Sequence, residues 1–157
     1  NRAALEERFA LEFERARRTS EPVACVFFDL DHFKSINDRY GHEAGDHALC
    51  HAVKVAQVQL RSVDALGRFG GEEFMVLMPD THLTHAREVA NRIRVALEET
   101  PLHVQGMTIS LSASFGAAVL GPSESIASVM RRADAAMYEA KRKGRNRVEV
   151  SLEQDSS

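Results

Sequence analysis

Carboxylate side chains gather in two short stretches of this 157-residue chain. Asp29 and Asp31 follow a nearly unbroken apolar run, and Glu72 and Glu73 follow two glycines within residues 68–74. Oxygen ligands suit Mg²⁺ or Mn²⁺, which bind through a few carboxylates and complete their coordination with water and substrate phosphates. If the two stretches meet in space, they could form a two-metal site that activates an attacking hydroxyl and stabilises a leaving phosphate.

Each carboxylate also has a purely structural interpretation. Asp31 precedes a predicted helix, and a role as the N-cap of that helix is favoured over a role as a metal ligand. For Asp29 the ligand role is favoured. A solvated acidic turn would explain Glu72 and Glu73 without any chemistry, although adjacent like charges repel and strand ends rarely favour Glu.

Phosphate groups need cations, and basic residues crowd the end of the last predicted helix: these are Lys141, Arg142, Lys143, Arg145 and Arg147. Lys34, which closely follows Asp29, could also reach a phosphate. Basic residues favour helix C-termini for dipole reasons alone, and a nucleic-acid patch is a further interpretation.

A purine base could be recognised near the second predicted helical region. Asn37 and Asp46 flank a glycine-containing bend, and a carboxylate can accept the paired N–H groups of guanine, which adenine lacks. His42 lies close to this proposed base pocket. The chain also has His47 and His51 nearby, but no Glu stands in the spacing of a zinc-protease helix, so these histidines are expected at the surface.

The elements that must position these residues follow from apolar periodicity. A helix with an apolar stripe at Leu5, Phe9 and Phe13 precedes a strand over residues 23–30, whose continuous apolar pattern predicts cover on both faces. A helical region over about residues 33–61 is expected to be interrupted near Gly41 and Gly45. A hairpin with a two-residue turn of positive φ is expected at about residues 65–78, and an amphipathic helix at about residues 86–97. A half-buried strand is expected at about residues 109–115, because apolar residues alternate there with Ser110, Ser112 and Ser114, which would face solvent. A last helix at about residues 126–137 and a short strand at about residues 148–150 follow.

The order of elements from residue 23 to 120 is β-α-β-β-α-β. It predicts an α/β fold, an α+β sandwich with a ferredoxin-like sheet and extra helices. A helical crossover joins the first two strands, so these should run parallel and end at the same edge of the sheet, where the hairpin turn also lies. Asp29 and Asp31 are therefore expected beside Glu72 and Glu73.

Bulk composition fits one domain over residues 1–152 with a disordered tail over residues 153–157. A net charge of −3 gives no general attraction to nucleic acid or acidic membranes. Cys25 and Cys50 show no metal or redox spacing and are expected to be buried, reduced thiols of a cytoplasmic protein. No segment predicts membrane insertion or a signal peptide. Because the chain begins at Asn1 without Met, it is expected to be a fragment whose missing N-terminal region includes a sensor domain and could tether the full-length protein to a membrane.

Six motifs occur in order along nearly the whole chain, at residues 27–34 (FFDLDHFK), 36–38, 41–42, 45–46, 68–74 (RFGGEEF) and 140–146. In order and spacing they resemble the GGDEF family of diguanylate cyclases. The resemblance implies the condensation of two GTP molecules into cyclic di-GMP, with release of two pyrophosphates, by a homodimer with a domain like the palm of nucleotide cyclases and polymerases. The family's Asp-x-Leu-Thr segment before Asn1 is absent, which could weaken GTP binding or coupling to a sensor.

The resemblance also implies a role for each matching residue. Two Mg²⁺ or Mn²⁺ ions would be held by Asp29, the backbone carbonyl of Leu30 and Glu72, with Glu73 supporting the metals or the substrate. Glu72 replaces the family's Asp, is an equally hard oxygen ligand, and would be the base for the ribose 3′-hydroxyl. Lys34 would assist catalysis by binding a phosphate. The residues implied in substrate binding are Phe33, Lys34, Asn37, His42, Asp46, Lys141 and Arg145.

A second site is implied upstream of the hairpin. Arg61 and Asp64 match the family's RxxD inhibitory site for its own product, cyclic di-GMP, and Arg92 resembles the secondary arginine of that site. A solvated helix end is the structural alternative. A non-catalytic module that binds GTP or cyclic di-GMP is the rival to an active cyclase, and the intact motifs favour the cyclase.

Overall fold

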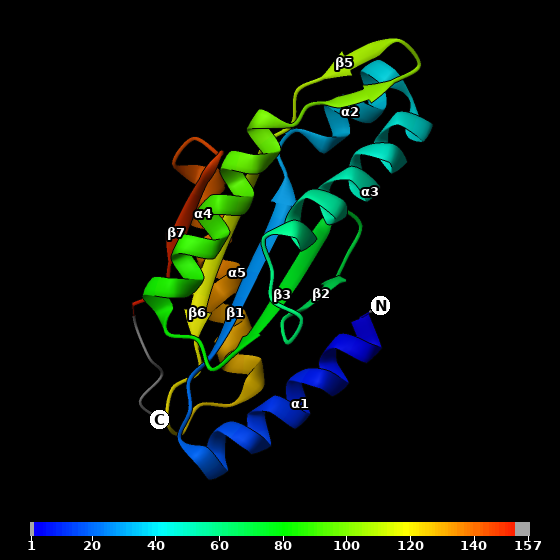
Figure 1. Ribbon diagram of the computed structural model, residues 1–157. Helices are drawn as coiled ribbons and strands as arrows, with labels where there is room; N and C mark the ends of the chain where they lie inside the picture. Colours follow the sequence, from blue (N-terminus) through cyan, green and yellow to red (C-terminus); the bar gives the residue numbers. More distant parts are fainter. Residues whose placement is uncertain (1, 153–157) are drawn as a thin grey trace.

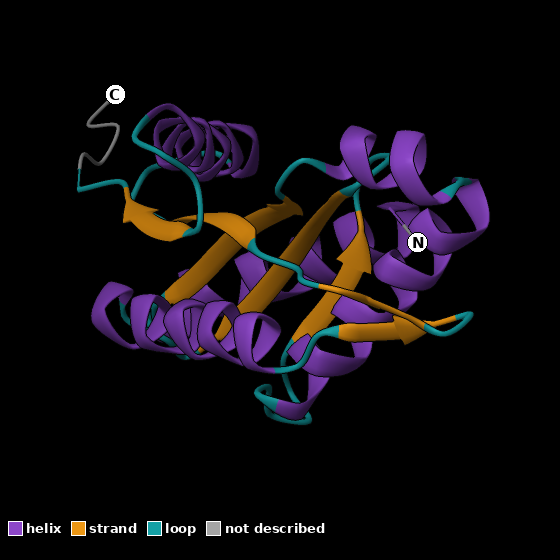
Figure 2. Ribbon diagram, turned by 90° about the horizontal axis from the view of Figure 1, so that it is seen from above, coloured by secondary structure: helices purple, strands orange, loops and turns teal. Residues whose placement is uncertain are grey.

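A five-stranded sheet with helices on both faces forms the centre of the protein (Figures 1 and 2). The computed structural model describes residues 2–152. Its elements are α1 (Arg2–Thr19), β1 (Val23–Leu30), α2 (Phe33–Tyr40), α3 (His42–Val58), β2 (Ala65–Arg68), β3 (Glu73–Pro79), α4 (Leu83–Glu99), β4 (Leu102–Val104), β5 (Met107–Ile109), β6 (Ala113–Val119), α5 (Ile126–Arg142) and β7 (Arg147–Val150). The tail predicted over residues 153–157 lies outside the described residues.

The strand order is β2-β3-β1-β6-β7, and β1 lies in the middle, antiparallel to both β3 and β6. The four strands β1, β2, β3 and β6 with their two crossovers confirm the ferredoxin-like core. β1 and β2 run in the same direction, as predicted, although β3 lies between them and is antiparallel to both. The loop between β2 and β3 therefore lies at the edge of the sheet where β1 ends.

The two faces of the sheet bury separate apolar clusters. Phe28 and Phe74 belong to the cluster covered by α3 and α4, whereas Phe27 and Met75 belong to the cluster covered by α1 and α5. Every residue of β1 is buried, which confirms the prediction of cover on both faces. Cys25 of this strand is buried as predicted, whereas Cys50 is exposed on α3, so the prediction was wrong for Cys50. A β-carbon on Gly116 would lie 2.1 Å from the backbone nitrogen of Met137, so this glycine lets α5 lie directly on the sheet.

Three local predictions were wrong. The helical region is interrupted at Gly41, where φ is 95°, but Gly45 lies inside α3. The loop of the β2–β3 hairpin spans residues 69–72, and neither of its glycines adopts a left-handed φ, so it is not a primed two-residue turn. The amides of Phe69 and Gly70 both donate to the carbonyl of Glu73 instead.

The strand predicted over residues 109–115 is also misplaced. Ile109 ends β5, which pairs with β4 in a separate two-stranded sheet, and β6 begins at Ala113. β6 is buried on both faces up to Ala118, and its Ser114 is fully buried. The alternating serines that suggested a solvated face have another explanation, which lies in the site described below.

None of the helices within residues 2–152 is both long and apolar enough to cross a membrane.

Candidate active site

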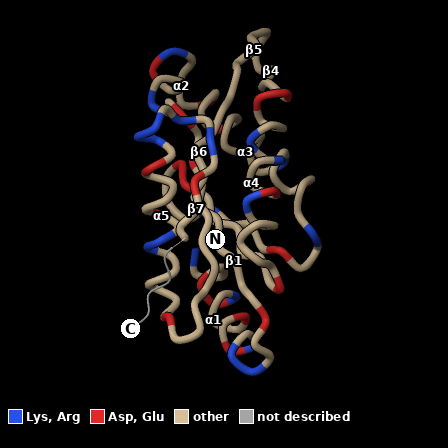
Figure 3. Tube along the Cα trace, turned by 90° about the vertical axis from the view of Figure 1, so that its left-hand side faces the viewer, with Lys and Arg blue, Asp and Glu red and all other residues tan. Residues whose placement is uncertain are grey.

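A cavity of about 270 Å³ opens at the edge of the sheet where β1 ends and α2 begins. Its lining comes from the end of β1, the start of α2, the β2–β3 loop, the last turn of α5 and the turn after it. The lining residues are Asp29, Leu30, Asp31, His32, Phe33, Lys34, Ser35, Glu72, Lys141 and Arg145. Residues that are more than a hundred positions apart thus meet, and Figure 3 shows basic positions beside acidic ones near α2.

Asp29 is the most buried charged group of this cavity, with an exposed fraction of 4%. Its Oδ2 accepts a hydrogen bond from the ammonium group of Lys141. Its Oδ1 is buried and has no hydrogen-bond partner within residues 2–152. Burial raises the pKa of Asp29, as do the charges of Glu72 and Asp31, against the opposing effect of Lys141. A buried oxygen without a donor is costly, so this atom is suited to a cation that enters the cavity.

The donor set fits Mg²⁺ or Mn²⁺ bound together with a phosphate substrate. Asp29 and Glu72 supply carboxylate oxygens, and Leu30 at the end of β1 offers a backbone carbonyl. Within residues 2–152 no group of three or more His, Cys, Asp or Glu side chains is arranged to hold a metal ion. Mg²⁺ needs no such closed cage, because it usually binds through one or two carboxylates and takes its other ligands from water and phosphate.

Asp31 is not the N-cap of α2, so this prediction was wrong. His32 occupies the cap position, with φ of 55° and no capping hydrogen bond from its side chain. The two oxygens of Asp31 accept hydrogen bonds from the hydroxyls of Ser112 and Ser114, each at 2.6 Å, and from the backbone amide of Asn146 at 3.0 Å. Sequence reasoning missed these three partners of the site. The alternation of serines with apolar residues was the available signal, but it was interpreted as a solvated face.

Glu73 lies apart from Glu72. It stands opposite Asp29 in the β1–β3 register, yet its side chain lines a different cavity, of about 590 Å³, between α1, α5 and the hairpin loop. Burial raises the pKa of Glu73, and the nearby charges of Asp134 and Asp29 add to this effect. Phe69, in the hairpin loop, also lines this cavity. Its ring packs edge-to-face against the ring of Phe27, with the two ring centroids 5.2 Å apart. The structure therefore brings Glu72, but not Glu73, into the cavity of Asp29.

The residues predicted to bind guanine, Asn37, His42 and Asp46, are not in the lining of this cavity. A β-carbon on Gly45 would lie 1.8 Å from Oδ1 of Asn37, so Gly45 serves the close contact between α2 and α3. The same β-carbon would lie 3.3 Å from the ring of Phe33, which also lines the cavity. His42 and Asp46 are exposed on the first turns of α3.

The basic cluster near the end of α5 divides into two groups. Lys141 and Arg145 line the cavity. Arg142 pairs with Glu139 at 2.8 Å, and Lys143 pairs with Glu149 at 2.9 Å, both outside the cavity. Lys34 has a side chain that is 92% exposed, and its ammonium lies 4.0 Å from Asp38. Lys34 also lines the cavity, so Lys34, Lys141 and Arg145 all place cationic side chains at it.

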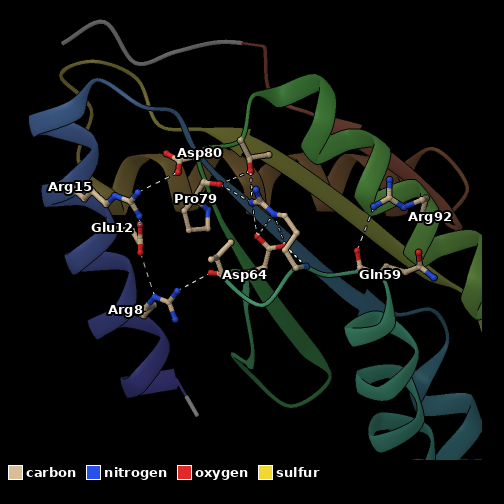
Figure 4. Close-up of polar contacts among 11 residues, drawn as sticks. Arg8, Glu12, Arg15, Gln59, Asp64, Pro79, Asp80 and Arg92 are labelled. Carbon is tan, nitrogen blue, oxygen red and sulfur yellow. Dashed lines mark hydrogen bonds and ion pairs between the residues drawn. The ribbon is translucent and has the colours of Figure 1, made fainter.

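Two residues of the second predicted site, Arg61 and Asp64, form an ion pair within the fold, whose surroundings are shown in Figure 4. Arg61 donates to both oxygens of Asp64, at 2.7 Å for the shortest contact, and also to the carbonyl of Pro79 and the hydroxyl of Thr81. The hydrogen bond and charge of Asp64 raise the pKa of Arg61. Arg92 lies to one side and donates a long hydrogen bond, 3.5 Å, to the carbonyl of Gln59. Arg61 and Asp64 are therefore in direct contact. Among the contacts of the described residues, Arg92 is linked to the segment that contains Arg61 only by its hydrogen bond to Gln59.

Comparisons with known sequences agree with this arrangement. The family model described as "Diguanylate cyclase, GGDEF domain" matches residues 1–147. The diguanylate cyclase DgcP of Pseudomonas aeruginosa is 42% identical over 151 residues, which cover 96% of this chain and 22% of the relative. A diguanylate cyclase of Vibrio cholerae is 40% identical over 147 residues, which cover 94% of this chain and 46% of the relative. The chain thus spans less than half the length of either relative.

Solved structures with the same fold include two GGDEF domains. The GGDEF domain of DgcB from Caulobacter crescentus, solved in complex with c-di-GMP, has a TM-score of 0.93 and 31% identity, covering 98% of this chain and 91% of that one. The active GGEEF domain of a diguanylate cyclase from Vibrio cholerae has a TM-score of 0.90 and 37% identity, covering 98% and 97%. Sequence and fold agree over almost the whole described part, and the chain therefore belongs to the GGDEF family of diguanylate cyclase domains.

Proposed function

We propose that this domain condenses two GTP molecules into cyclic di-GMP and releases two pyrophosphates. The observation that carries the proposal is the buried, unpartnered Oδ1 of Asp29, which lies in one cavity with Glu72, Lys141 and Arg145. A metal–triphosphate substrate matches this combination, because it supplies a cation to the carboxylates and anions to the lysine and arginine. Because the proposed substrate is GTP, the domain would act in the cytoplasm.

The residues of the cavity would have separate roles in metal binding and proton transfer. Asp29, the Leu30 carbonyl and Glu72 would hold Mg²⁺ or Mn²⁺, which when bound polarises the phosphate and lowers the pKa of the attacking hydroxyl. Glu72 would accept the proton of the ribose 3′-hydroxyl, since it lies at the exposed tip of the hairpin. We assign no metal to Glu73, because it lines the other cavity.

The remaining polar side chains would bind and orient the nucleotide. Lys34, Lys141 and Arg145 would meet the phosphates. On the far side of Phe33, Asn37 and Asp46 would hold the guanine edge, with His42 nearby, where a carboxylate accepts the N–H groups that adenine lacks. Lys141 already pairs with Asp29, so an incoming phosphate offers its ammonium a second anionic partner.

Catalysis would require two copies of the domain. Residues 2–152 form one such carboxylate cavity, which would present one GTP, yet the product needs two reciprocal 3′-hydroxyl attacks. Two domains facing each other about a twofold axis would let each nucleotide be attacked by its partner. A transient homodimer is therefore part of the proposal.

The test is to incubate the purified domain with GTP and Mg²⁺ and to separate the products by chromatography. We expect cyclic di-GMP, no corresponding product from ATP, and a specific activity that rises with protein concentration over a hundredfold range. A flat specific activity would argue against the dimer. If GTP binds in calorimetry but no product forms, the rival function is correct, a non-catalytic module that senses GTP or cyclic di-GMP.

We also propose that cyclic di-GMP inhibits the enzyme by binding at Arg61, Asp64 and Arg92. The two phosphates of the product suit guanidinium groups, which bind them in a bidentate manner. Because Arg61 already holds Asp64, Pro79 and Thr81 together, its substitution would disturb the fold as well as the site. Arg92 is the cleaner position for a test.

Substituting Arg92→Ala should raise the product concentration that halves the rate by about tenfold or more, since a hydrogen bond to a charged group is lost. The initial rate without product should change little, because Arg92 makes only a long contact within the described fold. Arg87→Ala, elsewhere on α4, is the matched control. The measurement is initial rate against added cyclic di-GMP, and equal inhibition of Arg92→Ala and Arg87→Ala would remove the inhibitory site from the proposal.

A further inference from the structure

The turn between α5 and β7 places three successive residues at positive φ. Gly144, Arg145 and Asn146 have φ of 126°, 65° and 47° in succession. Glycine adopts this region readily and asparagine tolerates it, but for Arg145 it is uncommon and costs free energy, so it persists only where the surroundings hold it. Arg145, one of the cavity's cations, lies in the middle of this turn.

Asp31 is the group that holds the turn from the sheet side. Asp31 is 6% exposed, and its carboxylate accepts a hydrogen bond from the backbone N–H of Asn146. The same carboxylate binds the hydroxyls of Ser112 and Ser114 at the start of β6, and the amide of Asp31 donates to the carbonyl of Ser112 at 2.9 Å. The end of β1, the start of β6 and the turn are thus joined at one side chain.

The opposite side of the turn is held by α4. The side-chain amide of Asn146 donates to Glu98 at 2.8 Å, and its oxygen accepts from Arg94 at 3.3 Å. The backbone N–H of Arg145 donates to the carbonyl of Ala140 at 2.9 Å. With the backbone fixed on these sides, Arg145 has its Cα, and therefore the root of its side chain, at a defined place beside the cavity.

We propose that Asp31 is a positioning residue, neither a helix cap nor a metal ligand, whose carboxylate fixes the turn at residues 144–146 so that Arg145 faces the substrate phosphates. The part of this inference that concerns phosphates rests on the proposed function. The part that concerns the turn does not, because it follows from contacts within the free protein.

Two substitutions of Asp31 can separate the effect of its hydrogen-bond geometry from the effect of its charge. An asparagine at position 31 can keep its amide oxygen where Oδ2 now accepts from Ser112 and Asn146. Its NH₂ group can then donate to the hydroxyl of Ser114, which is able to accept. Asp31→Asn therefore removes the charge and retains the geometry, whereas Asp31→Ala removes both.

The first measurement is hydrogen exchange of the Asn146 amide in the nucleotide-free domain. We expect Asp31→Ala to speed this exchange by at least about tenfold relative to neighbouring amides, because the hydrogen bond to the amide is lost. Asp31→Asn should exchange as the wild type does. Unchanged protection of Asn146 in Asp31→Ala would overturn the inference, whatever the domain does with GTP.

The second measurement is GTP affinity, with KM and kcat taken separately. Asp31→Ala should weaken GTP binding and raise KM by about tenfold, the loss expected when one charge-assisted contact is misplaced, while Asp31→Asn stays near wild type. Equal losses in both variants would show that the charge, not the position, matters. If Asp31→Ala does not fold, Ser112→Ala, which removes one anchor of the carboxylate, should show the same two effects in weaker form, and its failure to do so overturns the inference. If the wild type itself binds no GTP, the proposed function fails and the exchange experiment still decides the role of Asp31.

Discussion

Substituting Glu72→Gln should abolish formation of cyclic di-GMP while the domain stays folded. Glu72 lies in the loop between β2 and β3, beside the cavity of Asp29, and it is exposed, so glutamine causes no packing loss. The change removes the negative charge of the proposed metal ligand and the proposed base together. Removing one positioned electrostatic group from an active site costs ~3 kcal/mol or more of barrier, about a hundredfold in rate.

The matched control is Glu99→Gln, at an exposed glutamate at the end of α4, away from the cavity. It removes the same charge from the chain and should leave turnover unchanged. Product formation is measured by chromatography, and thermal unfolding confirms that both variants are folded. A folded Glu72→Gln protein with wild-type turnover would contradict the proposed mechanism.

The meeting of Asp29 and Glu72 could be predicted because it depends on topology rather than on side-chain detail. A continuous apolar run identifies a strand buried on both faces, and a helical crossover fixes the direction of the next strand. These two rules place the end of β1 and the hairpin loop at the same edge. The presence of β3 between β1 and β2 does not alter that result.

The roles of Asp31 and Glu73 could not be predicted, because they depend on the direction of single side chains. Asp31 finds its hydroxyl partners more than eighty positions along the chain, in Ser112 and Ser114. A local pattern offers only nearby partners, so it suggested a cap for the following helix. Glu72 and Glu73 are adjacent in sequence, but Glu73 is the first residue of β3 and its side chain follows the pleat to the α1 and α5 face.

A buried ion pair beneath α5 also escaped sequence reasoning. Glu124, which is 2% exposed, accepts two hydrogen bonds from the guanidinium of Arg132, at 2.6 and 2.8 Å, and others from Ser128 and the amide of Gly121. Arg132 also donates to the carbonyl of Val119 at the end of β6. The pair therefore fastens α5, which carries Lys141, to the sheet.

Substituting Arg132→Ala should lower the free energy of unfolding by about 3–5 kcal/mol, the usual cost of leaving a buried charge without its partner. Urea unfolding at neutral pH measures this loss. Arg131→Ala is the matched control, because Arg131 is the preceding residue of the same helix and is exposed. It should change stability by less than about 0.5 kcal/mol, as surface substitutions commonly do. A loss in Arg132→Ala no larger than that of the control would show that the pair does not fasten α5.

The difference between Arg132→Ala and the wild type should also shrink as the pH falls. Burial alone raises the pKa of Glu124, but hydrogen bonds from Arg132, Ser128 and Gly121 together lower it below the usual 4.5. In the wild type this carboxylate stabilises the fold above its unfolded pKa, and that contribution is lost as the pH falls through the folded value. In Arg132→Ala the hydrogen bonds and charge of Arg132 no longer oppose the effect of burial, so the pKa of Glu124 should rise. Acidification should then protonate this carboxylate and remove the buried charge. Unfolding curves measured from pH 7 down to about pH 4 should therefore converge, and a gap that stays constant over that range would mean that Glu124 is not the group left uncompensated.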